Sequence, residues 1–139
     1  MLLGFNKQFE NPILRGTKIH TLRKHKRKPK DGERLHMYRG LKTPDCKLIT
    51  NKKKLDGTQK VWIKICVFHD TGNAIKICVD GKKLTPEKIT EFCINDGFVS
   101  LSAFIYYWIK EHRKKQGNLK VPFKIIKSLN CHHWTPFRY

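Results

Sequence analysis

Three side chains with complementary chemistry follow one another closely near the start of the chain. Lys18 supplies an amine, Thr21 a hydroxyl and Arg23 a guanidinium. A dense cationic run comes next, made up of Lys24, Lys26, Arg27, Lys28 and Lys30. Amines, guanidinium groups and hydroxyls are the side-chain groups that hold phosphates. This segment therefore predicts a site for a phosphate-bearing ligand.

The same three side chains allow two kinds of chemistry. In one, Lys18 and Arg23 contact phosphates and Thr21 donates a hydrogen bond, so the ligand is bound without reacting. In the other, the Lys18 amine acts as a base toward the Thr21 hydroxyl, and neighbouring cations lower the pKa of that amine. On a regular strand these two residues face apart, so they meet only if residues 16–19 form a turn, which Gly16 allows. Binding without catalysis is the preferred interpretation, because no acidic partner follows securely from the spacing.

The charge balance points to a polyanionic partner. The chain holds 30 Lys and Arg against 11 Asp and Glu, a formal net charge of +19. An excess of this size concentrates polyanions around a protein, and it favours nucleic acid over a merely solubilising surface. Two further groups join the predicted nucleic-acid contacts: the lysine triplet Lys52, Lys53 and Lys54, and Tyr38 as a platform for base stacking. A basic accessory protein that binds acidic proteins stays a third possibility.

Length and cysteine content set the broad class. With 139 residues, the chain is expected to form one domain over 1–139 that acts as a monomer. No apolar run approaches the roughly 18 residues of a membrane span, and the first residues do not resemble a signal peptide. The cysteines are odd in number, which favours free thiols in a reducing compartment, so a cytoplasmic location is expected.

The patterning predicts an α+β domain with a small mixed or closed sheet. Strands are expected at 2–5, 19–23, 34–39, 60–68, 75–79 and 123–129, and helices at 10–15, at about 86–95 and at 101–116. The strand at 60–68 is apolar on both faces and is therefore expected in the middle of the sheet. Residues 41–58 are expected to be mostly loop.

Cys131, His132 and His133 form a local cluster of metal-binding residue types. They lack the Cys-x-x-Cys or His-x-x-x-His spacing of metal sites, and adjacent histidines on a strand point to opposite faces. The prediction is a buried thiol followed by histidines at a strand end, with no metal and no cofactor.

Taken in order, several short motifs resemble the ASCH domain family, which is similar to the PUA domains of RNA-modifying enzymes. The motifs are Ile13-Leu14-Arg15-Gly16-Thr17-Lys18 with Thr21 and Arg23, then Gly32-Glu33-Arg34-Leu35, Asp96-Gly97-Phe98, and Phe123-Lys124-Ile125-Ile126 with Trp134. The resemblance covers nearly the whole chain. It implies a PUA-like β-barrel with flanking helices and a nucleotide-sized cleft for RNA or a nucleoside beside the first helix.

The resemblance also implies a possible reaction. Bacterial acetylcytidine amidohydrolases, which this chain resembles more distantly, use a lysine, a threonine and a glutamate. Lys18 and Thr21 match the first two, and Asp96 stands nearest to the place of the glutamate. The predicted function is RNA or nucleic-acid binding. The alternative is a small hydrolase, acting on an acylated nucleoside or on RNA, with Thr21 as nucleophile, Lys18 as base and Asp96 as acid.

Overall fold

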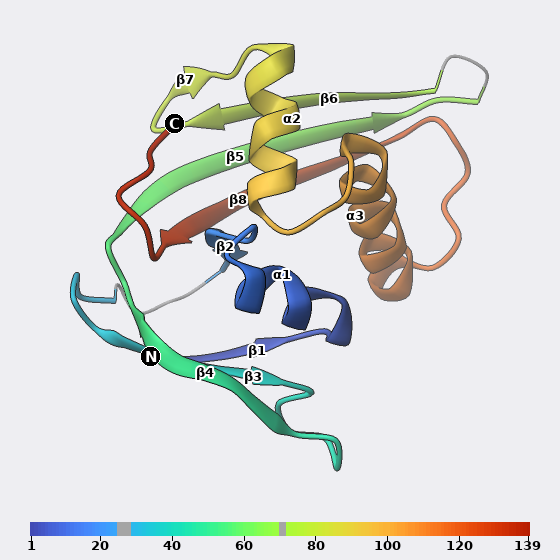
Figure 1. The fold of residues 1–139 in the computed structure, drawn as a ribbon. Coiled ribbons are helices and arrows are strands. Elements are labelled where there is room, and N and C mark those ends of the chain that lie inside the picture. Colours follow the sequence, from blue (N-terminus) through green and yellow to red (C-terminus); the bar gives the residue numbers. More distant parts are fainter. Residues whose placement is uncertain (25–28, 70–71) are drawn as a thin grey trace.

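The computed structural model describes residues 1–24, 29–69 and 72–139 of the chain (Figure 1). Within these ranges the elements are, in chain order, β1 (Leu2–Phe5), the 3-10 helix η1 (Lys7–Phe9), α1 (Glu10–Arg15), β2 (His20–Arg23), β3 (Arg34–Arg39), β4 (Lys47–Lys54), β5 (Gly57–Val67), β6 (Asn73–Val79), β7 (Lys82–Lys83), α2 (Pro86–Asn95), α3 (Leu101–Gln116) and β8 (Phe123–His133). Three residues of the predicted cationic run, Lys26, Arg27 and Lys28, lie outside the described residues.

The strands form two sheets. One has the order β1-β3-β4, with β1 parallel to β3 and β3 antiparallel to β4. The other has the order β2-β8-β5-β6-β7 and is antiparallel throughout. Figure 1 shows α2 and α3 on one side of the five-stranded sheet. The expectation of an α+β fold is confirmed.

Strand β5 carries the clearest sequence pattern and lies in the middle of its sheet. Val61, Ile63 and Ile65 alternate along one face and are buried. The strand pairs with β8 on one side and with β6 on the other, as its apolar character on both faces predicts. Its buried side chains belong to a hydrophobic core that also takes in Phe92 of α2 and Phe104 of α3.

The helix ends follow local signals. Helix α1 ends at Gly16, whose left-handed backbone (φ 78°) closes the last turn. The Thr85 side chain accepts a hydrogen bond from a backbone N–H in the first turn of α2, and the Ser100 side chain does the same for α3. Gly117 ends α3. The predicted bounds of α1 and α3 are therefore confirmed.

No helix among the described residues is both long enough and apolar enough to cross a membrane.

The prediction of a loop at residues 41–58 is wrong, because this segment contains all of β4 and the start of β5. Strand β4 pairs with β3 on one side only in the described part of the chain, so it lies at a sheet edge. Lysines are common on edge strands because they discourage pairing with another chain. Lys52 and Lys54 are exposed there. Such a strand lacks the apolar alternation by which a strand is recognised.

The expected closed barrel is not found among the described strands, which form two open sheets. The sheets meet at a corner made by Leu55 and Asp56, between β4 and β5. The Leu55 N–H donates to the Glu33 carbonyl beside β3, at 2.8 Å, and the Asp56 N–H donates to the His133 carbonyl of β8, also at 2.8 Å. The chain therefore passes from one sheet directly into the other.

Candidate functional site

Lys18 lies inside the protein, in the turn between α1 and β2. After Gly16 the chain folds back, so that the Lys18 N–H donates to the Pro12 carbonyl at 3.0 Å. The next residue, Ile19, donates to the carbonyl of Asn95 at the end of α2, at 2.9 Å. The side chain of Lys18 is thereby carried into the core, and the residue is 1% exposed. The turn at residues 16–19 that the site requires is confirmed.

Asp96 meets Lys18 at the end of α2. The Lys18 Nζ donates to Asp96 Oδ1 at 2.6 Å and also to the Asp96 backbone carbonyl. Gly97 follows with a left-handed backbone (φ 90°), and a Cβ at this position would lie 2.9 Å from Lys18 Cδ. The Asp-Gly pair follows the last residue of α2. Gly97 also makes room for the Lys18 side chain, and this role depends on tertiary contact.

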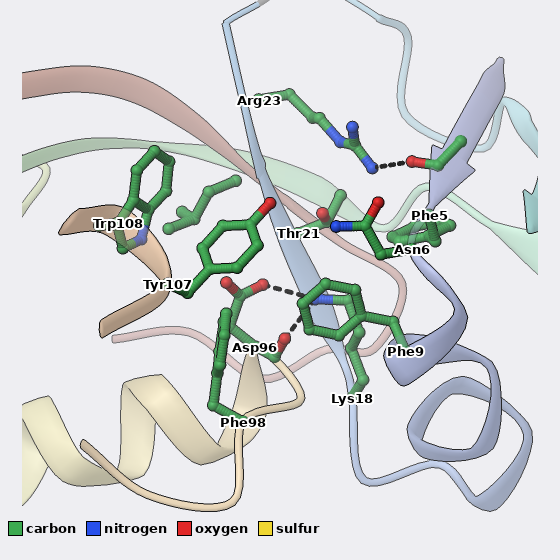
Figure 2. A pocket seen from close by; sticks show the side chains of 12 residues that line it. Phe5, Asn6, Phe9, Lys18, Thr21, Arg23, Asp96, Phe98, Tyr107 and Trp108 are labelled. Atoms are coloured by element: carbon green, nitrogen blue, oxygen red, sulfur yellow. Dashed lines mark hydrogen bonds and ion pairs between the residues drawn. The ribbon is translucent and has the colours of Figure 1, made fainter. Parts of the chain in front are cut away.

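The Lys18–Asp96 pair forms part of a small pocket of about 110 Å³. Its walls come from both sheets, from η1, from α3 and from the α2–α3 connection, and are formed by Gly4, Phe5, Asn6, Phe9, Lys18, Thr21, Leu22, Arg23, Asp96, Phe98, Tyr107 and Trp108. Figure 2 shows Thr21, Tyr107 and Asp96 facing a common space. Lys18, Thr21, Arg23 and Asp96, which were singled out from the sequence, are thus brought together.

Aromatic rings surround the cations of the pocket. Lys18 Nζ lies 4.7 Å from the centroid of the Phe9 ring, and Arg23 Cζ lies 5.0 Å from that of Phe5. Rings at these distances attract a cation through their quadrupole. Phe9 in turn packs edge to face on Phe98, with centroids 5.2 Å apart. The two cations therefore lie against aromatic rings on one side of the pocket.

Burial perturbs the protonation equilibria of the pair. Loss of solvation lowers the pKa of Lys18, and the adjacent Asp96 carboxylate partly opposes that change. Loss of solvation raises the pKa of Asp96, while Lys18 and then Arg23 oppose that rise. Burial therefore opposes the charged form of each group, and the 2.6 Å contact between Nζ and Oδ1 couples their protonation equilibria. Strongly perturbed groups in a pocket are typical of functional sites.

Arg23 connects the two sheets across the pocket. Its Nη2 donates to the backbone carbonyl of Gly4 in β1. Its Nε is buried and has no hydrogen-bond partner among the described residues. Burial lowers the pKa of this guanidinium, against the attraction of Asp96. Arg23 thus has a structural bond on one side and an unused donor on the other.

The remaining predicted contacts do not line this pocket. Lys24 and Lys30 are exposed, and Tyr38 is half-buried in β3. Lys52, Lys53 and Lys54 line a different and wider hollow, which also includes Trp134. No described basic side chain other than Lys18 and Arg23 therefore belongs to the pocket itself.

Sequence reasoning missed part of the wall. Asn6 and Phe9 come from the segment before α1, and Phe98 and Tyr107 come from either side of the α3 start. Trp108 of α3 also borders the pocket. The resemblance to ASCH domains marked Phe98 within a motif. Nothing in the local pattern distinguishes Asn6 or Tyr107.

A second buried polar cluster lies beside the first. His20 of β2 is 3.9 Å from Asp96, measured from Nε2 to Oδ1. Cys131 and His133 of β8 face His20, and all three side chains are fully buried. The sequence prediction that Cys131 is a buried thiol is confirmed.

No protein-family model, no curated protein and no solved structure matches the chain.

Proposed function

We propose that this protein is a PUA-like, ASCH-type domain that binds RNA or another nucleic acid and places the base or the phosphate of one nucleotide in the pocket beside α1. The observation that carries the proposal is the convergence of Lys18, Thr21 and Arg23 on one aromatic-walled pocket in a chain of net charge +19. Cationic surface supplies affinity for phosphates, and aromatic rings supply stacking for an unpaired base.

The pocket size fits part of a nucleotide rather than an extended strand. Its volume of about 110 Å³ is below the roughly 300–1,000 Å³ typical of sites for drug-sized ligands. One base or one phosphate therefore enters, and the rest of the strand lies outside. Lys24 and Lys30 are exposed on the segment that follows the pocket residues. Lys52 and Lys54 offer a second exposed set on β4 for more distant phosphates.

The salt dependence of RNA binding tests this proposal. Affinity for a fluorescent single-stranded RNA is measured by anisotropy between 50 and 200 mM salt. With about six phosphate contacts the affinity falls by roughly a thousandfold over that range. Arg23→Met is compared with Arg113→Met, an exposed cation of α3, and only the pocket variant is expected to lose more affinity than one charge explains. A flat salt response, or equal losses from the two variants, contradicts the proposal.

A second candidate function, hydrolysis, is favoured by the 2.6 Å contact between Lys18 and Asp96 beside Thr21. The ASCH resemblance matches Lys18 and Thr21 to a lysine and a threonine of acetylcytidine amidohydrolases, and Asp96 stands nearest to the place of their glutamate. In this scheme the Thr21 oxygen attacks the acyl carbonyl and its proton passes to Lys18. The C–N bond then breaks, the cytosine amine leaves with a proton from Asp96, and water hydrolyses the threonyl ester.

Turnover assays separate the two functions. Acylated cytidines and single-stranded RNA are incubated with the wild type, with Thr21→Val and with the control Thr17→Val, an exposed threonine of the same segment. Hydrolysis predicts release of free acid or of RNA fragments that Thr21→Val abolishes and Thr17→Val leaves unchanged. Turnover that survives in Thr21→Val rejects this threonine as the nucleophile. RNA binding without turnover leaves the first function alone.

A further inference from the structure

Three possible metal ligands converge between β2 and β8. His20 and His133 stand directly opposite each other in the antiparallel pairing of these strands. Cys131 precedes His133 by two residues, so both point to the same face of β8. One ligand atom from each of the three side chains lies within 4.8 Å of the other two. The strand pairing, rather than any local sequence spacing, assembles the cluster.

The ring nitrogens of this cluster lack partners. Both nitrogens of His133 and the Nε2 of His20 are buried without a hydrogen bond to any of the described residues. Both histidines are 0% exposed. A buried polar atom without a partner is costly, and buried nitrogens in native proteins are nearly always satisfied by protein, water or an ion.

His20 is oriented as metal-bound histidines are. Its Nδ1 lies 3.3 Å from the hydroxyl of Tyr139. When the Nδ1–H donates to that hydroxyl, the other ring nitrogen is left unprotonated and free to bind a metal. The free atom is Nε2, and the Oδ1 of Asp96 lies 3.9 Å from it. His132 points to the other face, where its Nδ1 is 3.0 Å from the Thr58 hydroxyl, so it is not part of the cluster.

We propose that His20, Cys131 and His133 bind a zinc-class divalent cation that fastens β2 to β8. Two imidazoles and one thiolate are a ligand set that suits zinc, and a site with every ligand buried is typical of a structural metal. Bonds of about 2.0–2.3 Å place tetrahedral ligand atoms roughly 3.5 Å apart. The side chains therefore close on the cation by about 1 Å or less each. Asp96, whose Oδ1 lies 3.9 Å from His20 Nε2, offers a carboxylate for the fourth position.

This inference does not rest on the proposed function, because none of His20, Cys131 and His133 lines the pocket. From the sequence, no metal was predicted here, because Cys131-His132-His133 lacks the spacing of a metal site. That spacing does exclude the adjacent His132 as a ligand of the same metal ion. It says nothing of His20, which the fold supplies from a distant part of the chain.

The metal content of the protein is the first measurement. The chain is expressed without an affinity tag in medium containing zinc, purified without chelator, and analysed by inductively coupled plasma mass spectrometry. We expect about one equivalent of zinc per chain for a single closed site. A content that stays near zero after incubation with zinc and gel filtration overturns the proposal.

Two matched cysteine variants identify the ligands. Cys131→Ser is compared with Cys93→Ser, which alters another buried thiol outside the cluster. Zinc affinity, measured by competition with a chromophoric chelator, is expected to fall by more than a hundredfold in Cys131→Ser and to stay within about threefold in Cys93→Ser. Equal affinity in the two variants would mean that the metal binds elsewhere, and would overturn the assignment.

Cobalt gives a readout that does not depend on the folding of a variant. Co²⁺ added to the metal-free wild type is expected to produce a thiolate-to-cobalt charge-transfer band and the visible bands of a tetrahedral ion. The melting temperature should rise with zinc and fall with chelator. Cobalt spectra without any charge-transfer band would show that no thiolate is bound, which also contradicts the proposal.

Discussion

Lysine occurs in two contrasting settings in this protein, inside the pocket and along the edge of β4. Lys18 is 1% exposed and its ammonium touches a carboxylate at 2.6 Å. Lys52 and Lys54 are exposed on a strand that, within the described residues, pairs on one side only. The pocket lysine is held in one geometry and has lost its hydration. The edge lysines keep theirs, so they contribute to a long-range field rather than to a defined contact.

The largest difference in stability is expected when the buried ammonium of Lys18 and the exposed ammonium of Lys52 are each removed. Lys18→Met leaves the buried Asp96 carboxylate without its partner and should lower the free energy of unfolding by about 3–5 kcal/mol. Lys52→Met, the matched change on β4, should stay within about 0.5 kcal/mol. Urea denaturation measures both. Similar losses from the two variants would mean that Lys18 is not a structural member of the pocket.

The energetic coupling between Lys18 and Asp96 should also be measurable in the free energy of unfolding. Asp96→Asn removes the opposite charge while keeping the size of the side chain. If the pair acts as a unit, the double variant Lys18→Met with Asp96→Asn is less unstable than the sum of the single variants, by about 1–3 kcal/mol. A double-mutant cycle from denaturation curves gives this value. If the two single losses simply add, the contact between Lys18 Nζ and Asp96 Oδ1 contributes no specific stability.

Alanine substitutions at two glycines test how tightly the backbone around Lys18 is packed. Gly97 and Gly16 both have left-handed backbones, but only at Gly97 would a Cβ meet Lys18. Gly97→Ala is expected to lower the free energy of unfolding by roughly 2–3 kcal/mol, as strain and displacement of the lysine combine. Gly16→Ala has open space around it and should cost about 1 kcal/mol. Thermal or urea unfolding measures both losses of stability. Equal losses would mean that the Lys18 side chain moves aside from the new Cβ without cost.

The smallest effect on stability is expected on β4. Replacing Lys52, Lys53 and Lys54 by glutamine should leave unfolding nearly unchanged while reducing the slope of log affinity against log salt by up to about three. The control replaces Lys110, Arg113 and Lys115 of α3, which carry the same charge on a different element. A slope that falls equally in both triple variants would assign RNA binding to net charge rather than to β4.

Elements with strong local signals could be predicted, and those defined by distant contacts could not. A cap and a stop glycine fix α3 within its own sequence, and Gly16 does the same for α1. Strand β4 has no such signal, because an edge strand bearing lysines shares its composition with loops. In the pocket, Lys18 and Thr21 were recognisable by type and spacing. Asn6 and Tyr107 were not, because only the packing of η1 and α3 brings them there.

The corner at Leu55 and Asp56 has a consequence for how the pocket opens. Phe5 and Gly4 on one wall belong to the three-stranded sheet, whereas Thr21 and Arg23 on the other belong to the five-stranded sheet. Both sheets share the continuous chain at this corner, and Arg23 spans them at the far side. A change of a few degrees in the dihedral angle between the sheets would widen or narrow the aperture. Substitutions at the corner would therefore alter the aperture without changing a residue that lines the pocket.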